Sequence, residues 1–223
     1  MKQHFASVLT TAIAALALSF TAQSCCSASA EQSQSAASAT QVSQTDRSAA
    51  VIETIMTRRS VRRYKPQAVG RDTLTTIVRC GINAPNGMNR QPWEVRIVDS
   101  RDFIDGITAV ARAKDPRMAA DSTATTMFRN AYTVIFVGAK DGCELDCGIL
   151  GENMALSAWS MGLGTCFLGG PIRFIKDTPE CQPYLERLGF SEGVELLYAM
   201  AVGYPDETPE AKPRDESKFR FVE

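Results

Sequence analysis

The chain has 223 residues, of which 44% are hydrophobic and 22% are charged, and these proportions are ordinary for a globular protein. Its formal net charge of -1 argues against a nucleic-acid partner and against electrostatic attraction to a membrane. The one histidine, His4, lies close to the N-terminus. If that end is removed, Ser-His-Asp and Cys-His catalysis and histidine-ligated zinc are excluded, so the chemistry must come from other side chains or from a cofactor.

The N-terminus has the layout of an export signal. Lys2 gives a positive start, residues 12–20 form an apolar run, and small residues lead to Cys25. The run is too short to span a bilayer comfortably, although a retained membrane anchor is the alternative. Residues 1–25 are therefore expected to direct the protein to the cell envelope or periplasm. The Ser-Cys pair at Cys25 also resembles a lipoprotein cleavage site, so the mature protein is expected to be either lipid-anchored through Cys25 or secreted without lipid.

Residues 26–48 consist mainly of Ser, Ala, Gln and Thr and offer almost nothing to bury. Such a segment gains too little from burial to offset the entropy that it would lose on ordering. We expect a flexible tether here, followed by one folded domain over residues 49–223.

Within this domain, apolar residues at helical spacing predict helices, and alternating or β-branched runs predict strands. The expected helices are residues 49–57, 71–83, 103–110, 122–130, 146–161 and 179–188. The expected strands are residues 93–98, 132–137, 165–168 and 194–202. Helices and strands are mixed without a βαβ rhythm, which favours an α+β sandwich over a doubly wound sheet. The helix over residues 146–161 is apolar around much of its circumference, so it should be central and end at Gly162.

The cysteines that follow residue 26 give no clear metal site. They are Cys80, Cys143, Cys147, Cys166 and Cys181. None forms a CxxC pair, and without histidine they make no convincing zinc ligand set. Cys143 and Cys147 could form a disulfide in an oxidising envelope, or both could be reduced and simply buried.

A run of arginines at residues 58–64, with the sequence Arg-Arg-Ser-Val-Arg-Arg-Tyr, follows the first expected helix of the domain. Guanidinium groups pair bidentately with phosphate, and Ser60 can add a hydroxyl donor. Without an anion, four clustered cations would repel one another. The run therefore indicates either a phosphate site or a solvated basic turn.

Three further segments could meet a ligand. Residues 84–93 form a turn-rich loop, and its side-chain amides could form hydrogen bonds with the edge of a planar heterocycle. Alternatively the loop is a structural turn that contains Pro and Gly and ends at Trp93 in the core. Residues 162–170 are glycine-rich, but they follow a helix and enter a strand, which is the wrong order for a dinucleotide-binding turn. A glycine-rich strand edge still allows a ligand close to backbone N–H groups. Lys212 and Arg214 add basic charge in the polar C-terminal segment.

Taken together and in this order, these segments resemble the FMN-dependent nitroreductase family over residues 51–214. The resemblance rests on Arg-Arg-Ser-x-Arg from Arg58, on Ala-Pro-x-x-x-Asn-x-Gln-Pro-Trp ending at Trp93, on the helix that ends in Met-Gly-Leu-Gly, and on Gly-Tyr-Pro at residues 203–205. It implies a three-layer α+β sandwich with a central, mostly antiparallel sheet flanked by helices. It also implies a homodimer with FMN at the interface.

The resemblance also assigns roles to individual residues. It implies that Arg58, Ser60 and Arg62 bind the FMN phosphate and ribityl chain, and that Arg59 faces the isoalloxazine. The phosphate site would be completed by Lys212 and Arg214, and the flavin would be lined through backbone groups by Leu168 and Gly169. The other subunit would contribute Pro85, Asn86, Gly87 and Asn89. Asn86 stands where the family usually has Ser or Thr.

The implied activity is reduction of nitroaromatics, quinones or similar planar acceptors by two-electron transfer, with the flavin rather than a side chain carrying the chemistry. The reduced donor is NAD(P)H or, for an exported protein, a donor of the envelope. A reductive dehalogenase, a flavin-fragmenting relative and a tethered flavoprotein electron carrier remain alternatives. Substrate loops decide among them, and residues 112–124 give the sequence's one indication of such a loop.

Overall fold

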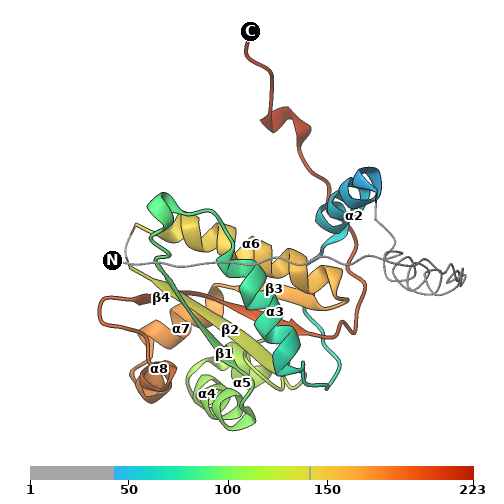
Figure 1. Cartoon of the computed structure of the whole chain (residues 1–223). Coiled ribbons are helices and arrows are strands. Elements are labelled where there is room, and N and C mark those ends of the chain that lie inside the picture. Colours follow the sequence, from blue (N-terminus) through green and yellow to red (C-terminus); the bar gives the residue numbers. More distant parts are fainter. Residues whose placement is uncertain (1–42, 141) are drawn as a thin grey trace, which may run out of the picture. The chain divides into compact units, whose positions relative to one another are not determined.

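The computed structural model describes residues 43–140 and 142–223 (Figure 1). Residues Thr45–Glu223 form one compact unit. The expected signal, its Cys25 and the tether up to residue 42 lie outside the described residues. Within the part of the chain that the structure describes, no helix is long and apolar enough to cross a membrane.

Four antiparallel strands form one sheet in the order β1-β2-β4-β3. They are β1 (Trp93–Val98), β2 (Thr133–Ala139), β3 (Gly164–Leu168) and β4 (Glu195–Gly203). Every residue of β2 is buried, as its β-branched run predicts for a central strand. The four strands expected from the sequence are confirmed to within two residues at each end.

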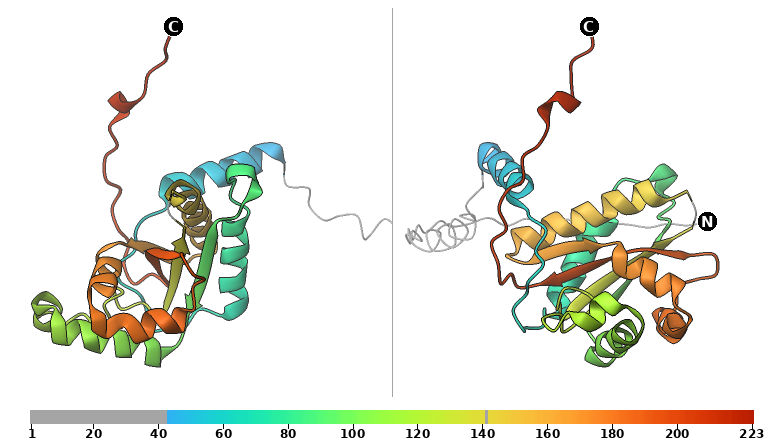
Figure 2. Two further views of the ribbon diagram at one scale, coloured as in Figure 1. Left: turned by 90° about the vertical axis from the view of Figure 1, so that its left-hand side faces the viewer. Right: turned by 180° about the vertical axis from the view of Figure 1, so that it is seen from behind.

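Helices cover both faces of this sheet, which confirms the three-layer α+β sandwich (Figures 1 and 2). Alternation along β2 sorts the core: Val134 and Phe136 belong to one cluster, whereas Ile135 and Val137 belong to the other. The first cluster contains side chains of α4 (Arg101–Lys114), α7 (Gly170–Asp177) and α8 (Gln182–Leu188). The second contains side chains of α3 (Arg71–Ile82) and α6 (Glu144–Ser160).

The helix α6 is buried as expected, because it packs against both the sheet and α3. Leu150 and Met154 are fully buried, and at Gly151 an added Cβ would lie 2.6 Å from the Tyr198 hydroxyl oxygen. The helix ends before Gly162, whose φ of +75° is the left-handed conformation expected at such a stop.

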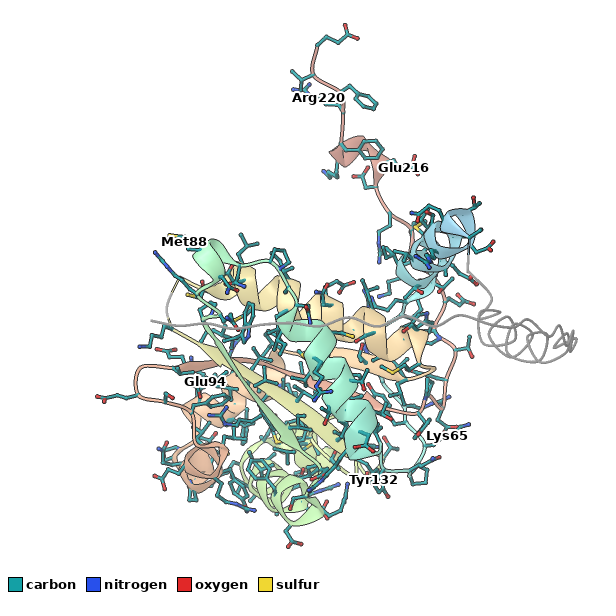
Figure 3. All side chains as sticks on the ribbon, viewed as in Figure 1. Lys65, Met88, Glu94, Tyr132, Glu216 and Arg220 are labelled. Atoms are coloured by element: carbon teal, nitrogen blue, oxygen red, sulfur yellow. The ribbon has the colours of Figure 1, made fainter. Side chains whose placement is uncertain are left out.

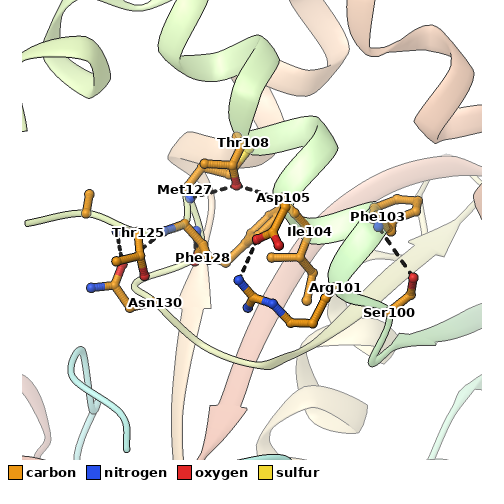
Figure 4. A network of polar contacts seen from close by, with 12 residues as sticks. Ser100, Arg101, Phe103, Ile104, Asp105, Thr108, Thr125, Met127, Phe128 and Asn130 are labelled. Atoms are coloured by element: carbon orange, nitrogen blue, oxygen red, sulfur yellow. Dashed lines mark hydrogen bonds and ion pairs between the residues drawn. The ribbon is translucent and has the colours of Figure 1, made fainter. Parts of the chain in front are cut away.

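The helix expected at residues 122–130 is wrong. The segment is a series of turns, because its short polar side chains accept backbone hydrogen bonds that a helix would otherwise use. The Asn130 side-chain oxygen accepts from the amides of Thr125 and Thr126 at 2.7 and 3.0 Å. Arg129 and Asn130 both have left-handed backbone, with φ of 61° and 64°. Figure 4 shows Asn130 beside Thr125 and the neighbouring contacts of this segment.

Other differences concern helix boundaries. The first described helix, α2 (Gln44–Thr57), begins within the expected tether, and Asp46 in its first turn favours that start. Two helices of the structure, α5 (Pro116–Ala120) and α7, were not predicted from the sequence. The helix expected at residues 179–188 is a 3₁₀ turn, Pro179–Cys181, followed by α8.

No disulfide bond joins cysteines in the described part of the chain. Of the two states considered for Cys143 and Cys147, the structure therefore has the reduced one. Cys147 is fully buried among the side chains that pack α6 on the sheet. That burial raises the pKa of its thiol to about 11.

Candidate functional site

The arginine segment, defined as residues 58–64, runs along the edge of the sheet beside β3. Ser60 forms a parallel bridge with Thr165, and the Val61 amide donates to the Thr165 carbonyl at 2.9 Å. Val61 itself is fully buried. Because Gly164 has no side chain, Val61 can approach closely: a Cβ on Gly164 would lie 2.6 Å from the Val61 Cβ. Side chains alternate along an extended segment, so Val61 points inward and its neighbours remain accessible.

Tyr64 fixes the far end of the segment. It forms a bridge with Pro205, and its hydroxyl donates to the Val61 carbonyl at 2.6 Å. Burial raises the pKa of this hydroxyl well above its ordinary value, so it remains a donor. At Gly203 an added Cβ would lie 2.8 Å from the Tyr64 ring, so this glycine makes room for the ring. The segment is therefore held by β3 at one end and by the end of β4 at the other.

Arg58 is a largely buried cation, with 22% of its side chain exposed. Its Nε lies 3.3 Å from a carboxylate oxygen of Glu152, yet this nitrogen makes no hydrogen bond within the described residues. The pair is thus close enough for ionic attraction but poorly aligned. A buried N–H without an acceptor is unfavourable, and an anion placed beside it would correct this.

Arg59 is turned back toward the preceding helix. Its guanidinium donates to the carbonyls of Met56 and Arg58, both at 2.8 Å, and so satisfies carbonyls at the C-terminal end of α2. Neither Arg58 nor Arg59 is among the residues that line the pocket described next, whereas Arg62 is.

An open pocket with a volume of about 630 Å³ lies at the end of β3. One wall, the strand wall, is made of residues 166–171 together with Arg62 and Arg63. A second wall, the loop wall, is made by the lining residues that lie between residues 115 and 130. Leu168 and Gly169, expected from the sequence at the flavin, therefore share a pocket with Arg62.

Lys212 and Arg214 lie in the exposed C-terminal segment, which runs away from the sheet (Figures 1 and 2). The Arg214 guanidinium donates to the Lys212 carbonyl at 3.3 Å. Across residues 43–140 and 142–223, no hydrogen bond or ion pair joins either residue to Arg58, Ser60 or Arg62.

The C-terminal segment nevertheless leaves the domain beside the arginine segment. Glu207 accepts from the amides of Arg62 and Arg63, and the Asp206 amide donates to the Arg63 carbonyl at 3.0 Å. Five extended residues span roughly 17 Å, so Lys212 is within reach of the arginine segment if this part of the chain folds back.

The loop expected to serve another subunit is at the other side of the domain. Figure 3 shows Met88, which lies within this loop, and Lys65, which follows the arginine segment, on opposite sides. The Asn86 side-chain oxygen accepts from the Gln91 amide at 2.8 Å, and Met88 and Asn89 have left-handed backbone in the 3₁₀ turn Gly87–Asn89. Neither this turn nor the preceding Pro85 and Asn86 is among the lining residues of the pocket in their own chain. Trp93 is buried at the start of β1, as expected for a residue of the core.

Arg63 of the arginine segment also lines the pocket, together with Arg117 and Arg129, which were not singled out from the sequence. The last two were missed because residues 122–130 were assigned to a helix and α5 was not expected. A signal was present at α5, where Asp115 is followed by Pro116: Asp is a favoured N-cap and Pro is favoured at the first helical position.

Comparison with known proteins defines the class to which this arrangement belongs. The chain is 29% identical over 185 residues to an NADPH-flavin oxidoreductase of Vibrio harveyi, a match that covers 73% of this chain and 69% of that protein. A nitroreductase with bound FMN from Desulfitobacterium hafniense superposes with a TM-score of 0.69 at 26% identity, covering 78% of this chain and 98% of that one. A nitroreductase with bound FMN from Bacteroides fragilis gives a TM-score of 0.68 at 26% identity, with the same coverage of each chain.

The class is therefore that of the flavin-dependent oxidoreductases. Residues 55–204 match the nitroreductase family, and the chain belongs to this family. The resemblance and the enzyme class expected from the sequence are thereby confirmed, and FMN, the expected cofactor, is the group that both solved relatives hold.

Proposed function

We propose that the protein is an FMN-dependent oxidoreductase that reduces nitroaromatics, quinones or similar planar acceptors in two-electron steps. The proposed donor is NAD(P)H or a reduced donor of the envelope. The observation that carries the proposal is the convergence of Arg62, Leu168 and Gly169 on one pocket, with the arginine segment fixed beside β3.

The residues of the site fit a bound FMN. Its phosphate is a dianion, and Arg58 offers a buried Nε–H that lacks a hydrogen-bond acceptor in the described chain. Ser60 would add a donor from the same segment, and Lys212 and Arg214 would complete the phosphate site from the C-terminal segment. When bound, the flavin supplies hydride acceptance and release at N5.

The remaining roles fall to the chain's own groups. Backbone groups of Leu168 and Gly169 would orient the ring at the end of β3, and Arg62 would place positive charge beside it. Arg59 was expected to face the ring, but its guanidinium donates to the carbonyls of Met56 and Arg58, so Arg62 is the better candidate for that position.

Exposed apolar surface supports a homodimer. Val51, Ile52, Ile55 and Met56 of α2 are each at least half exposed, at 59%, 60%, 50% and 68%. Contiguous apolar patches of this kind mark interaction surfaces. We propose an isologous dimer in which Pro85, Asn86, Gly87 and Asn89 of each chain reach the flavin of its partner.

The location of the protein is a separate proposal that rests on the sequence alone. Residues 1–25 would direct export, and Cys25 would carry a lipid that holds the domain at the envelope. Metabolic labelling with radioactive palmitate in a bacterial host tests this proposal. Label that disappears in Cys25→Ala supports a lipoprotein, whereas an unlabelled full-length chain in the wild type contradicts it.

The enzymatic proposal is tested by purifying the full chain from its membrane or envelope fraction. The expected result is a yellow protein with one FMN per subunit that reduces a nitroaromatic with a reduced nicotinamide donor. A colourless protein that takes up no added FMN would contradict the proposal. FMN that is bound and reducible, but reduces no acceptor in a broad panel, would contradict the enzymatic part of it.

A further inference from the structure

More arginines line the pocket than a bound FMN phosphate alone would need. Its lining includes four arginines, Arg62, Arg63, Arg117 and Arg129, against two aspartates, Asp115 and Asp121. Both aspartates are already engaged in local turns. Asp115 accepts from the Arg117 amide at 2.9 Å, and Asp121 accepts from the amides of Thr123 and Ala124 at 2.9 and 3.1 Å.

The arginines differ in how far they are committed to other groups. The Arg63 guanidinium donates to the Asp206 carbonyl at 3.0 Å and lies 3.9 Å from Glu207. Arg117 lies 3.8 Å from Asp115, although 96% of its side chain is exposed. For the Arg129 guanidinium, no hydrogen bond and no ion pair is found anywhere in residues 43–140 and 142–223. Arg129 is therefore the uncommitted cation of the loop wall.

The backbone that carries Arg129 is held in place. Its φ of 61° is a conformation that non-glycine residues rarely adopt and that surrounding contacts must stabilise. Those contacts come from Asn130, which accepts two amides, and from Thr108 in α4, whose hydroxyl accepts from the Met127 amide at 3.2 Å (Figure 4). Arg112 of the same helix donates to the Ala124 carbonyl.

Arg62 of the strand wall and Arg129 of the loop wall both lie near Cys166 of β3. Burial raises the pKa of the Cys166 thiol, while both guanidinium groups act on it in the opposite direction. Cys166 itself lines the pocket. The two positive charges are therefore close to one strand position, and a molecule between the walls would meet both.

FMN has one anionic group, its phosphate, and the residues proposed for it include Arg58, Ser60 and Arg214, none of which lines this pocket. We propose that Arg129 makes the pocket selective for reactants that carry an anionic group beside their planar ring. A carboxylated nitroarene as acceptor and a phosphate-bearing reduced nicotinamide as donor share this chemistry. The inference rests on the proposed function, because it concerns the reactants of the same flavin site.

The shape of the surface agrees with a reactant longer than one ring. Beyond Arg117 the pocket continues into a neighbouring hollow of about 500 Å³, which shares Met118 and Pro171 with the first. This hollow adds Arg173. It also adds Asp177, so the hollow lengthens the site without increasing its net positive charge.

The test compares charged and uncharged reactants in the FMN-loaded full chain. The acceptor pair is 4-nitrobenzoate and 4-nitrobenzamide, and the donor pair is NADPH and the uncharged N-benzyl-1,4-dihydronicotinamide. In Arg129→Gln we expect kcat/KM for the charged member of at least one pair to fall about tenfold, the lower end for a hydrogen bond between charged groups. The uncharged member should change little, and added salt should weaken the discrimination.

Two further variants separate charge from structure. Arg129→Lys should recover most of the lost activity, since it keeps the positive charge. Arg79→Gln on α3 makes the same change of charge outside the pocket and should leave both members of each pair unaffected.

The outcome assigns the anion. A loss confined to 4-nitrobenzoate supports an anionic acceptor, and a loss confined to NADPH supports recognition of the donor's phosphate. An equal loss for both members of each pair, or no loss at all, overturns the inference. If the wild-type protein binds no FMN, or fails to turn over even the uncharged pair, the proposed function itself has failed.

Discussion

The strand wall of the pocket is held by backbone pairing, whereas the loop wall is held by side chains. Next to the strand wall, the Val61 amide donates to the Thr165 carbonyl, and Val61 is fully buried. On the loop wall, Asp121 and Asn130 accept backbone amides, and the surrounding residues are largely exposed. Backbone pairing resists substitution, while a loop built by a few side chains can change its surface easily. We infer that the strand wall fixes the cofactor and the loop wall selects the reactant.

The largest expected effect is on cofactor binding at the strand wall. Arg62→Ala should weaken FMN binding by about 1.5–3 kcal/mol, the range for a hydrogen bond to a charged group. Fluorescence titration of the apoprotein with FMN measures this change, and Arg79→Ala is the control with the same loss of charge. An Arg62→Ala variant with wild-type affinity would remove Arg62 from the cofactor site.

The next effect tests how the arginine segment is held. In Gly164→Ala the new Cβ would lie 2.6 Å from the buried Val61 Cβ, so the segment must shift. We expect a loss of about 1–3 kcal/mol in the free energy of unfolding, as for other overpacked cores, together with weaker FMN binding. Urea denaturation measures the first quantity.

Gly148→Ala in α6 is the matched control for this change, because no atom lies within 4 Å of its added Cβ. It should be neutral, or more stable by up to about 1 kcal/mol, since alanine is the better helix former. Equal stability of the Gly164→Ala variant and the wild type would show that the segment is not packed as described.

A smaller effect is expected at the loop wall. Asn130→Ala removes the acceptor for two amides and places alanine in left-handed backbone, so the local structure should lose about 1–2 kcal/mol. Hydrogen exchange at Thr125 and Thr126 should accelerate while exchange in β2 remains slow. Thr75→Ala, at an exposed position of α3, also removes one side-chain hydrogen bond and should leave both regions unchanged. Acceleration throughout the sheet would contradict the independence of the two walls.

The smallest effect concerns pH. Hydrogen bonds from Thr123, and then Ala124, hold the pKa of the Asp121 carboxyl below its ordinary value. Because its folded pKa is depressed, the contribution of Asp121 to stability is present above the ordinary aspartate pKa and is lost as pH falls through the folded value. Protection of residues 123 and 124 against exchange, taken relative to the intrinsic rate at each pH, should therefore fall on acidification in the wild type, and Asp121→Asn should remove most of that pH dependence. An unchanged pH profile in Asp121→Asn would show that this carboxylate does not hold the loop.

The strand wall was largely predictable from the sequence, and the loop wall was not. The run that forms β2 has a hydrophobic pattern that allows little but a buried strand, and the arginine segment is recognisable from its order of residues. Residues 122–130 also have apolar residues at helical spacing, but Asn130 reaches back to two amides and replaces the helix. That reach depends on φ near 64° at Asn130 itself, which local spacing does not encode.

The position of the 85–89 loop shows another limit of the sequence. Its amides suggested ligand recognition, yet the loop lies on the other side of the domain from the arginine segment, as Met88 and Lys65 mark in Figure 3. Only a second copy of the chain would bring it to a flavin. The residues of the loop carry no direct information about such a partner, and the expectation of one came from the family resemblance alone.

The account depends most on the claim that two distant stretches of the chain together bind one phosphate. The direct measurement compares the affinities of the apoprotein for FMN and for riboflavin, which lacks the phosphate, in the wild type, in Arg58→Ala and in Arg214→Ala. We predict that the wild type strongly prefers FMN, and that each variant loses affinity for FMN while its affinity for riboflavin is retained. Equal affinities for the two flavins in the wild type, or equal losses for both in the variants, would contradict the account.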